Sequence, residues 1–166
     1  MRKVDHRSLD LLESVVSIAR VSKATRGGRK SSFRVCVLVG NRLGCVGYGS
    51  ATHSEVIEAK SKAVRKAKSS VFRFSLKDGR TIHHELSCKF GASKIFLKPA
   101  PPGTGIVAGG AVREFCDMVG VSDVIAKSYG SSNPALVIRN ALKAFSCIYP
   151  PRYIANKRDK NVSGLE

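Results

Sequence analysis

The sequence predicts an α+β protein with two domains, and three observations lead to this prediction. Segments with strand patterns and segments with helix patterns both occur, and the patterns start afresh after a polar turn near residue 80. The 166 residues are 43% hydrophobic, which is enough to bury a core in two small domains. We expect a first domain at 10–75, a second at 80–148 and a basic tail at 149–166.

Three antiparallel strands are expected in the first domain. Glu13–Val21 can alternate as a strand, Phe33–Val39 is rich in β-branched residues, and Cys45–Gly49 follows a short turn at Asn41–Gly44. The connection Lys23–Ser32 is basic, contains a glycine pair and is longer than a tight turn. We therefore expect it to form a loop that projects from the sheet.

A helix with two unlike faces should follow the third strand. Thr52 and Glu55 fit a capping box, and Glu55–Ser70 contains no glycine or proline. At about 100° per residue, small apolar side chains share one face and basic side chains share the other. The basic residues are Lys62, Arg65, Lys66 and Lys68. A basic face on a single helix is most often only solvated, so it indicates a partner only together with other basic segments.

The second domain is expected to begin after the turn at Leu76–Arg80. Thr81–Phe90 alternates between apolar and polar residues as a half-buried strand does, and Lys94–Lys98 reads as a second strand. A loop rich in proline and glycine then leads to a helix at Gly110–Val119, closed by Gly120.

A short apolar stretch at Asp123–Lys127 separates this helix from the last one. Asn133 should cap the last helix, with Pro134 in its first turn and an end near Cys147. The tail beyond it is polar and basic, and we expect it to order only against a partner.

The balance of charge points to a polyanionic partner. There are 29 Lys and Arg against 12 Asp and Glu, a net charge of +17 that repels itself unless a polyanion neutralises it. DNA, RNA and an anionic membrane would all satisfy this charge. No apolar run of about 18 residues occurs, and residues 1–10 lack the apolar core of a secretory signal, so we expect a cytosolic location.

Cysteine and histidine patterns offer no catalytic or metal site. The five cysteines are far apart, contain no CxxC pair and are odd in number, so we expect buried free thiols. His83 and His84 are adjacent on a predicted strand, where they would point to opposite faces and could not easily chelate one ion. We therefore expect no cofactor, no metal ion and no catalytic residue.

One glycine-rich segment, Gly103–Gly110, could cradle a phosphate, because it precedes a helix N-terminus. It lacks the GK[ST] ending of a P-loop and the GxGxxG spacing of a dinucleotide site. A nucleotide-dependent enzyme therefore remains only an alternative. The other interpretation is that these glycines permit tight turns and close packing.

The basic connection between the first two strands is more informative. Lys23, Arg26, Arg29 and Lys30 surround Gly27 and Gly28, so cations can bind phosphates while the backbone approaches a nucleic acid closely. A meander followed by a helix with a basic face resembles the double-stranded-RNA-binding fold, which recognises A-form shape and phosphates. RNA is thus favoured over DNA, and a DNA-binding architectural protein is a third alternative.

Three segments carry a resemblance to a known family: Arg20–Phe33, Gly103–Val121 and Ala126–Pro134. They closely resemble the bacterial-type fifth protein of the small ribosomal subunit, over about residues 10 to 160. The resemblance implies a non-enzymatic protein with a double-stranded-RNA-binding-like first domain. It implies a second α/β domain of the ribosomal protein five domain-two type, with a left-handed crossover against the general right-handed rule.

The resemblance also implies partners and a location. These are small-subunit ribosomal RNA, small-subunit proteins four and eight, and a place in the cytoplasmic ribosome near the channel where messenger RNA enters. Family members support assembly and translational accuracy. Carried over by position, the segment Lys23–Ser32 would reach the RNA near the head and neck of the subunit, where spectinomycin-resistance changes in the family occur. No DNA or membrane partner is expected. The residues expected to bind RNA are Arg20, Lys23, Arg26, Gly27, Gly28, Arg29, Lys30, Lys62, Arg65 and Lys66.

The sequence departs from the family pattern in one place. Where the family has GxGxGKAxEV, this chain has GYGSATHSEV at Gly47–Val56. Ala51, Thr52 and His53 stand where Gly, Lys and Ala are expected, so the usual lysine is absent.

Overall fold

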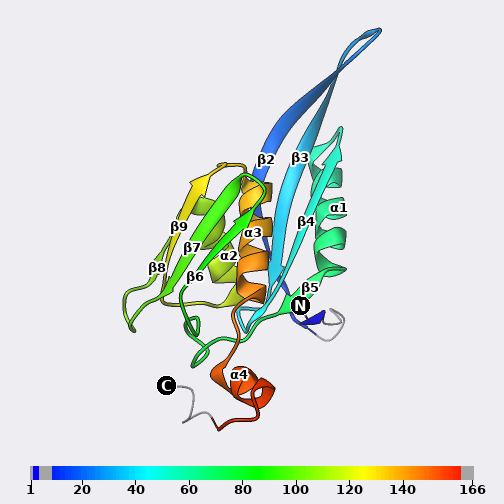
Figure 1. Ribbon diagram of the computed structural model, residues 1–166. Coiled ribbons are helices and arrows are strands. Elements are labelled where there is room, and N and C mark those ends of the chain that lie inside the picture. Colours follow the sequence, from blue (N-terminus) through cyan, green and yellow to red (C-terminus); the bar gives the residue numbers. More distant parts are fainter. Residues whose placement is uncertain (1, 4–8, 162–166) are drawn as a thin grey trace.

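Two β-sheets form the framework of the computed structural model, which describes residues 2–3 and 9–161 (Figure 1). The first sheet is antiparallel, in the order β1-β5-β4-β3-β2. Its strands are β1 (Arg2–Lys3), β2 (Leu12–Thr25), β3 (Gly28–Gly40), β4 (Cys45–His53) and β5 (Val71–Arg73). Positions 1, 4–8 and 162–166, which include parts of the predicted start and tail, lie outside the described residues.

The expected loop at Lys23–Ser32 is instead a continuous β-hairpin. Strand β2 extends to Thr25 and β3 begins at Gly28, so only Arg26 and Gly27 connect them. The prediction of a loop was wrong because this part of the hairpin is exposed on both faces. No apolar alternation is then needed, and the backbone ladder alone continues the strands.

Helix α1 (Val56–Lys68) packs across one face of the first sheet. The predicted capping box is wrong: Thr52 belongs to β4, and Glu55 is the N-cap without a side-chain cap. The helix approaches β4 so closely that a Cβ at Gly49 would collide with the Ala63 carbonyl oxygen. This close contact explains why β4 carries glycine at Gly47 and Gly49 beneath the helix.

The second sheet has the order β6-β7-β9-β8. Its strands are β6 (Leu86–Phe90), β7 (Ser93–Pro99), β8 (Ile106–Val107) and β9 (Val124–Gly130). The prediction of a strand over all of Thr81–Phe90 was too long, because residues 81–85 are irregular and Thr81 donates its hydroxyl to the Asp123 carbonyl at 2.6 Å. His83 and His84 therefore do not lie on a strand. The apolar stretch Asp123–Lys127 proves to enter strand β9, which pairs with both β7 and β8.

Helix α2 (Gly110–Val119) connects the parallel strands β8 and β9, so it forms the crossover whose left-handedness remains a prediction. Its predicted end is confirmed, since Gly120 has a left-handed φ of 92°. The predicted start of α3 (Pro134–Ser146) is confirmed as well. The Asn133 side chain accepts a hydrogen bond from the Ala135 N–H at 3.1 Å.

Helices α2 and α3 lie between the two sheets, as Figure 1 shows, and join them in one core. Phe74, Phe115 and Phe145 meet there with ring centroids 5.2 to 6.5 Å apart. Leu38 and Val46 of the first sheet belong to the same buried cluster. The two halves of the chain are therefore packed against each other and hold their outer surfaces in a fixed relation.

The tail differs from the expectation that it orders only against a partner. Residues Pro151–Lys157 form helix α4, with Pro151 in its first turn and Ala155 buried. Tyr149 and Tyr153 stack with ring centroids 4.9 Å apart. The basic composition of the segment gave no indication of these apolar contacts. They stabilise a short helix that needs no partner.

Cysteine burial follows the prediction except at the last position. Cys36, Cys45, Cys88 and Cys116 are buried free thiols, whereas the free thiol of Cys147 is exposed. Within the described residues, no cluster of three His, Cys, Asp or Glu side chains could hold a metal ion. No helix of that part of the chain is long and apolar enough to cross a membrane.

Candidate nucleic-acid interface

The tip of the β2–β3 hairpin projects beyond the rest of the first sheet (Figure 1). Strand β3 pairs with β4 only as far as Phe33 and His53, whereas its pairing with β2 continues to Thr25 and Gly28. The five further residue pairs, from Val21↔Ser32 to Thr25↔Gly28, extend the ribbon by roughly 17 Å. The hairpin tip is therefore free to enter a partner.

The hairpin carries a concentrated positive charge. No Asp or Glu occurs between Glu13 and Glu55 in the sequence. Six cations lie within this interval on β2, the turn and β3, and all six are exposed: Arg20, Lys23, Arg26, Arg29, Lys30 and Arg34. Among the described residues none of them is paired with a carboxylate. These six cations can therefore bind an anion of another molecule.

The register places these cations on both faces of the ribbon. Lys23 lies directly opposite Lys30, and Ala24 lies opposite Arg29. Since successive residues of a strand point to opposite faces, the two lysines share one face and Arg29 lies on the other. Arg20 is on the face of Arg29, where its guanidinium donates to the Ser31 hydroxyl at 3.1 Å. The ribbon can thus meet phosphates on two sides.

The glycine pair at the tip leaves the backbone uncovered. A Cβ at Gly27 or at Gly28 would have no heavy atom within 4 Å. Gly28 has a φ of 128°, a conformation that L side chains rarely adopt. Gly27 and Gly28 therefore allow a close approach of the main chain to a partner, as the sequence predicts.

Helix α1 presents its basic residues on two flanks rather than on one continuous face. Lys66 lies against the β4 side of the helix, where its Nζ donates to the Ser50 carbonyl at 3.4 Å, and Lys62 lies one turn before it. Lys68 lies on the opposite flank and forms an ion pair with Glu13 at 2.9 Å. Arg65 is exposed on that second flank. The sequence places all these residues outside the core but cannot show that the two flanks face different surroundings.

A polar groove of about 560 Å³ lies where β4 meets the start of α3. Three cationic side chains line it, and two of these, Arg34 and Arg139, are absent from the RNA-binding residues predicted from sequence. Arg34 lies directly opposite Thr52, so a cation adjoins the position where the family pattern has lysine. The remaining cation is Lys66, which connects the groove to α1.

Tyr48 is one of the residues that line this groove. The Arg139 guanidinium lies 5.9 Å from the centroid of its ring. Burial raises the pKa of Tyr48 to about 12, and the neighbouring Cys36 thiol adds to this effect. The hydroxyl therefore stays neutral, and the groove keeps its positive character. Arg34 could have been found from the sequence by pairing the predicted strands, which brings it opposite Thr52. Arg139 could not have been found in this way, because it lies on the distant helix α3.

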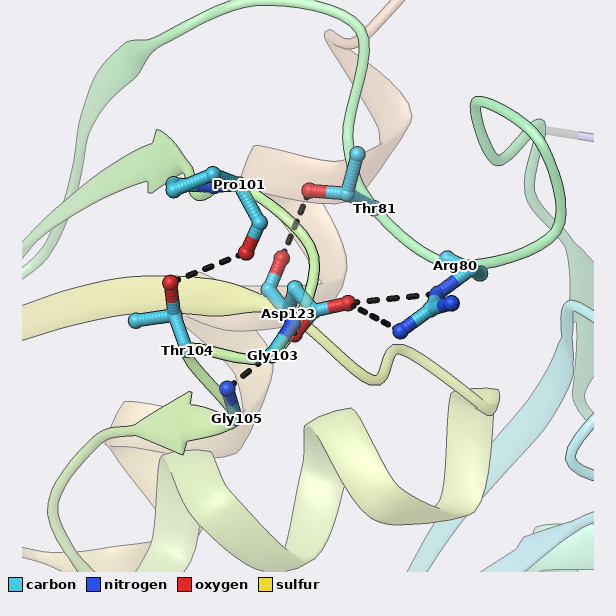
Figure 2. A network of polar contacts seen from close by, with 7 residues as sticks. All are labelled: Arg80, Thr81, Pro101, Gly103, Thr104, Gly105 and Asp123. Carbon is cyan, nitrogen blue, oxygen red and sulfur yellow. Dashed lines mark hydrogen bonds and ion pairs between the residues drawn. The ribbon is translucent and has the colours of Figure 1, made fainter.

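The glycine-rich segment Gly103–Gly110 already holds an anion from its own chain. The buried Asp123 accepts hydrogen bonds from the Gly103 N–H at 3.0 Å and the Gly105 N–H at 3.1 Å, and its other oxygen binds Arg80 at 3.0 Å (Figure 2). The pKa of the Asp123 carboxyl lies below its ordinary value, chiefly because Gly105 donates to it. The Gly103 and Gly105 N–H groups are thus occupied by a carboxylate, which supports the structural interpretation of these two glycines.

Known proteins resemble the chain over nearly its whole length. The family described as ribosomal protein S5, N-terminal domain, matches residues 11–75, and the family described as ribosomal protein S5, C-terminal domain, matches residues 88–158. A protein named small ribosomal subunit protein uS5 from Neorickettsia sennetsu is 65% identical over 163 residues, which cover 98% of this chain and 95% of the relative.

Two further relatives carry the same name. That of Anaplasma marginale is 49% identical over 95% of this chain and 90% of its own length. That of Wolbachia pipientis wMel is 47% identical over 94% of this chain and 92% of its own length. The resemblance predicted from the sequence and the prediction of a non-enzymatic protein are both confirmed. The chain belongs to the ribosomal protein S5 family.

Proposed function

We propose that this protein is a structural constituent of the small ribosomal subunit and binds ribosomal RNA through the β2–β3 hairpin. The observation that carries this proposal is the projecting ribbon with six exposed cations and no carboxylate partner among the described residues. Without a polyanion, the positive side chains of this ribbon would repel one another. Family membership supports RNA as that polyanion, and it supports a location in the cytoplasmic ribosome.

The RNA-binding residues proposed are those of the hairpin and of α1. Arg20, Lys23, Arg29 and Lys30 bind phosphates along the ribbon, and Arg26 with the Gly27–Gly28 backbone contacts RNA at the tip. On α1, Lys62 and Lys66 contact RNA on the β4 flank and Arg65 on the other flank. We add Arg34 and Arg139, because they line the groove that Lys66 also lines.

The groove supports a specific role for Arg34. The family pattern has lysine at position 52, and this chain has Thr52 directly opposite Arg34. Cross-strand neighbours have Cβ atoms about 5 Å apart, so the guanidinium of Arg34 can reach the space that a lysine at position 52 would serve. We propose that Arg34 supplies the phosphate contact there.

The finer functional features rest on the family resemblance. The protein contacts small-subunit proteins four and eight, lies near the channel where messenger RNA enters, and supports subunit assembly and translational accuracy. The hairpin tip approaches the RNA region where spectinomycin acts. The domains extend over 10–75 and 80–148, followed by the tail 149–166, a division supported by the family matches at 11–75 and 88–158.

A nucleotide-dependent enzyme is not favoured by the site geometry. The Gly103 and Gly105 N–H groups donate to Asp123, so a phosphate bound by these two groups would have to displace a buried carboxylate. A DNA-binding role predicts equal affinity for DNA and A-form RNA. Competition between DNA and RNA duplexes of the same sequence, at one salt concentration, distinguishes it from the proposal.

The experiment is a binding and sedimentation assay with the full chain. Arg26→Ala/Arg29→Ala should lower occupancy of small subunits and flatten the salt dependence of RNA affinity by about two ions, roughly one for each phosphate that is no longer neutralised. Lys77→Ala/Arg113→Ala removes the same charge from exposed positions outside the hairpin and α1, and it should leave both quantities near those of the wild type. Equal reductions in the two double variants would refute a role for the hairpin.

A further inference from the structure

The outer face of the second sheet carries no covering element among residues 2–3 and 9–161. Helices α2 and α3 pack on one face of β6, β7, β8 and β9, and no helix lies over the other face in Figure 1. The paired residues identify the side chains that point outward. They are Ser87, Lys89, Lys94, Phe96, Lys98, Val107, Ile125, Lys127 and Tyr129.

Lysines surround two aromatic rings on this outer face. Phe96 is directly opposite Lys127, and Lys94 is directly opposite Tyr129. The two rings are thus diagonal neighbours, about 7–8 Å apart at their backbones. Lys98 is two residues from Phe96 on the same strand and on the same face, so each ring has at least two lysines beside it.

The charge of the face is of one sign. Four of its outward side chains are exposed lysines, and none of the outward positions in these described strands is acidic. Lys89 and Lys94 are even direct cross-strand partners, an arrangement that is destabilising in the free protein. Tyr129 is 56% exposed although its ring is large and apolar. Both features are explained if an anionic, aromatic ligand covers the face.

We propose that this outer face is a second RNA-binding surface that takes unpaired nucleotides. Bases stack on Phe96 and Tyr129, and the phosphates between them lie against Lys94, Lys98 and Lys127. An open sheet with aromatic rings and flanking cations suits single-stranded RNA, whose bases are free to stack. A protein partner fits less well, because lysine is depleted in the cores of protein interfaces. The face is separate from the hairpin and does not depend on it.

The test uses the full chain with an oligouridylate of about 12 nucleotides as an unpaired probe, and an RNA duplex of about 16 base pairs as a second probe. Phe96→Leu/Tyr129→Leu keeps the apolar surface and removes the aromatic rings. Affinity for the oligouridylate should fall at least about tenfold, since each stacked base contributes roughly 5- to 150-fold. Affinity for the duplex should change little. Arg26→Ala/Arg29→Ala should show the reverse selectivity.

A matched control removes two other exposed aromatic rings. Tyr149→Leu/Tyr153→Leu changes the stacked pair near α4 and should leave oligouridylate affinity unchanged. A direct signal is also accessible, because the chain contains no tryptophan. In a Phe96→Trp variant, stacking of a base should quench the indole fluorescence, and the quenching should persist when Arg26 and Arg29 are replaced by alanine.

Two results would overturn the proposal. The first is an oligouridylate affinity that does not change in Phe96→Leu/Tyr129→Leu, together with unquenched fluorescence of Phe96→Trp. The second is that Phe96→Leu/Tyr129→Leu is no longer incorporated into small subunits although its affinities for the oligouridylate and the duplex are unchanged. That result would assign the face to a protein partner. Neither result bears on the hairpin, whose duplex binding is measured separately.

Discussion

Lys23 and Lys30 lie directly opposite each other on the β2–β3 hairpin, where their side chains share one face of the ribbon. Like charges in this relation are destabilising, and no carboxylate among the described residues neutralises them. The pair therefore lowers the stability of the free hairpin. An arrangement of this kind is expected where the charge serves binding rather than folding.

Replacing one of these lysines should stabilise the free hairpin while weakening RNA binding. For Lys30→Thr we expect about 0.5 kcal/mol of local stabilisation at low salt, because repulsion with Lys23 is removed and threonine suits a strand. Amide hydrogen exchange of Thr25 and Gly28, the pair that closes the hairpin, measures it as roughly twofold slower exchange. The gain should shrink as salt screens the charges. Slower exchange with undiminished RNA affinity would mean that Lys30 does not contact RNA.

The hairpin tip should distinguish the effect of charge from that of backbone strain. Gly28→Asp places an anion where a phosphate binds and forces a side chain into a φ of 128°, so it should weaken assembly or change the response to spectinomycin. Gly28→Ala carries the strain alone, about 1–3 kcal/mol. Gly27→Ala adds the same methyl group in open space without a positive φ.

We expect the three variants to bind RNA in the order Gly27→Ala, Gly28→Ala, Gly28→Asp, from strongest to weakest. Binding is measured as occupancy of small subunits at fixed salt. Equal occupancy for all three would argue that the tip is not in contact with RNA.

Asp123 should give the protein a specific pH dependence of stability. Its pKa is lowered in the folded state, chiefly by the Gly105 N–H, from an ordinary value of 3.8. The contribution of the Asp123 carboxylate to the free energy of unfolding is therefore complete above about pH 3.8, and it is lost as the pH falls through the lower pKa of the folded state. Asp123→Asn should lower the free energy of unfolding at neutral pH, and the difference from the wild type should shrink in acid.

Chemical denaturation of the two proteins between neutral pH and about pH 2.5 measures this difference. Asp78→Asn is the control, because Asp78 is exposed in the turn before the second half of the chain. A difference between wild type and Asp123→Asn that stays constant with pH would show that the carboxylate is not the group that stabilises the loop.

The contact of α1 with β4 should tolerate no added methyl group. Gly49→Ala places a Cβ against the Ala63 carbonyl, so the helix must move away from the strand. We expect a decrease of about 1–3 kcal/mol in the free energy of unfolding and weaker RNA binding, because Lys62 and Lys66 move with the helix. Gly109→Ala, with no heavy atom within 4 Å of the new Cβ, is the matched control. A stability change of the same size in both variants would contradict the close contact.

Elements with local signals could be predicted from the sequence. The end of α2 at Gly120 and the start of α3 at Asn133 depend on residues next to them in the chain, and both predictions are confirmed. The start of α1 was placed too early, because Thr52 matches a capping motif but is held in β4 by pairing with Arg34. Pairing with a distant strand is stronger than a weak local signal.

The candidate site could be predicted in part. The cations of the hairpin follow one another in the sequence, so their clustering is visible before the fold is known. Arg139 joins Arg34 only because α3 packs beside β4, and the lysines of the outer sheet face gather only through the register of β6, β7 and β9. The occupation of the glycine-rich loop by Asp123 depends on contacts 18 and 20 residues apart, which no local pattern reveals.

The central claim is that the hairpin tip contacts ribosomal RNA in the assembled small subunit. A hydroxyl-radical source tethered to Gly27→Cys, in a chain with Cys147→Ser, tests it most directly. Position 27 has open space for the side chain, and the other four cysteines are buried. We predict strong cleavage of the small-subunit RNA at a few neighbouring nucleotides. Subunits that contain the tethered protein but show no cleavage from position 27 would contradict the account.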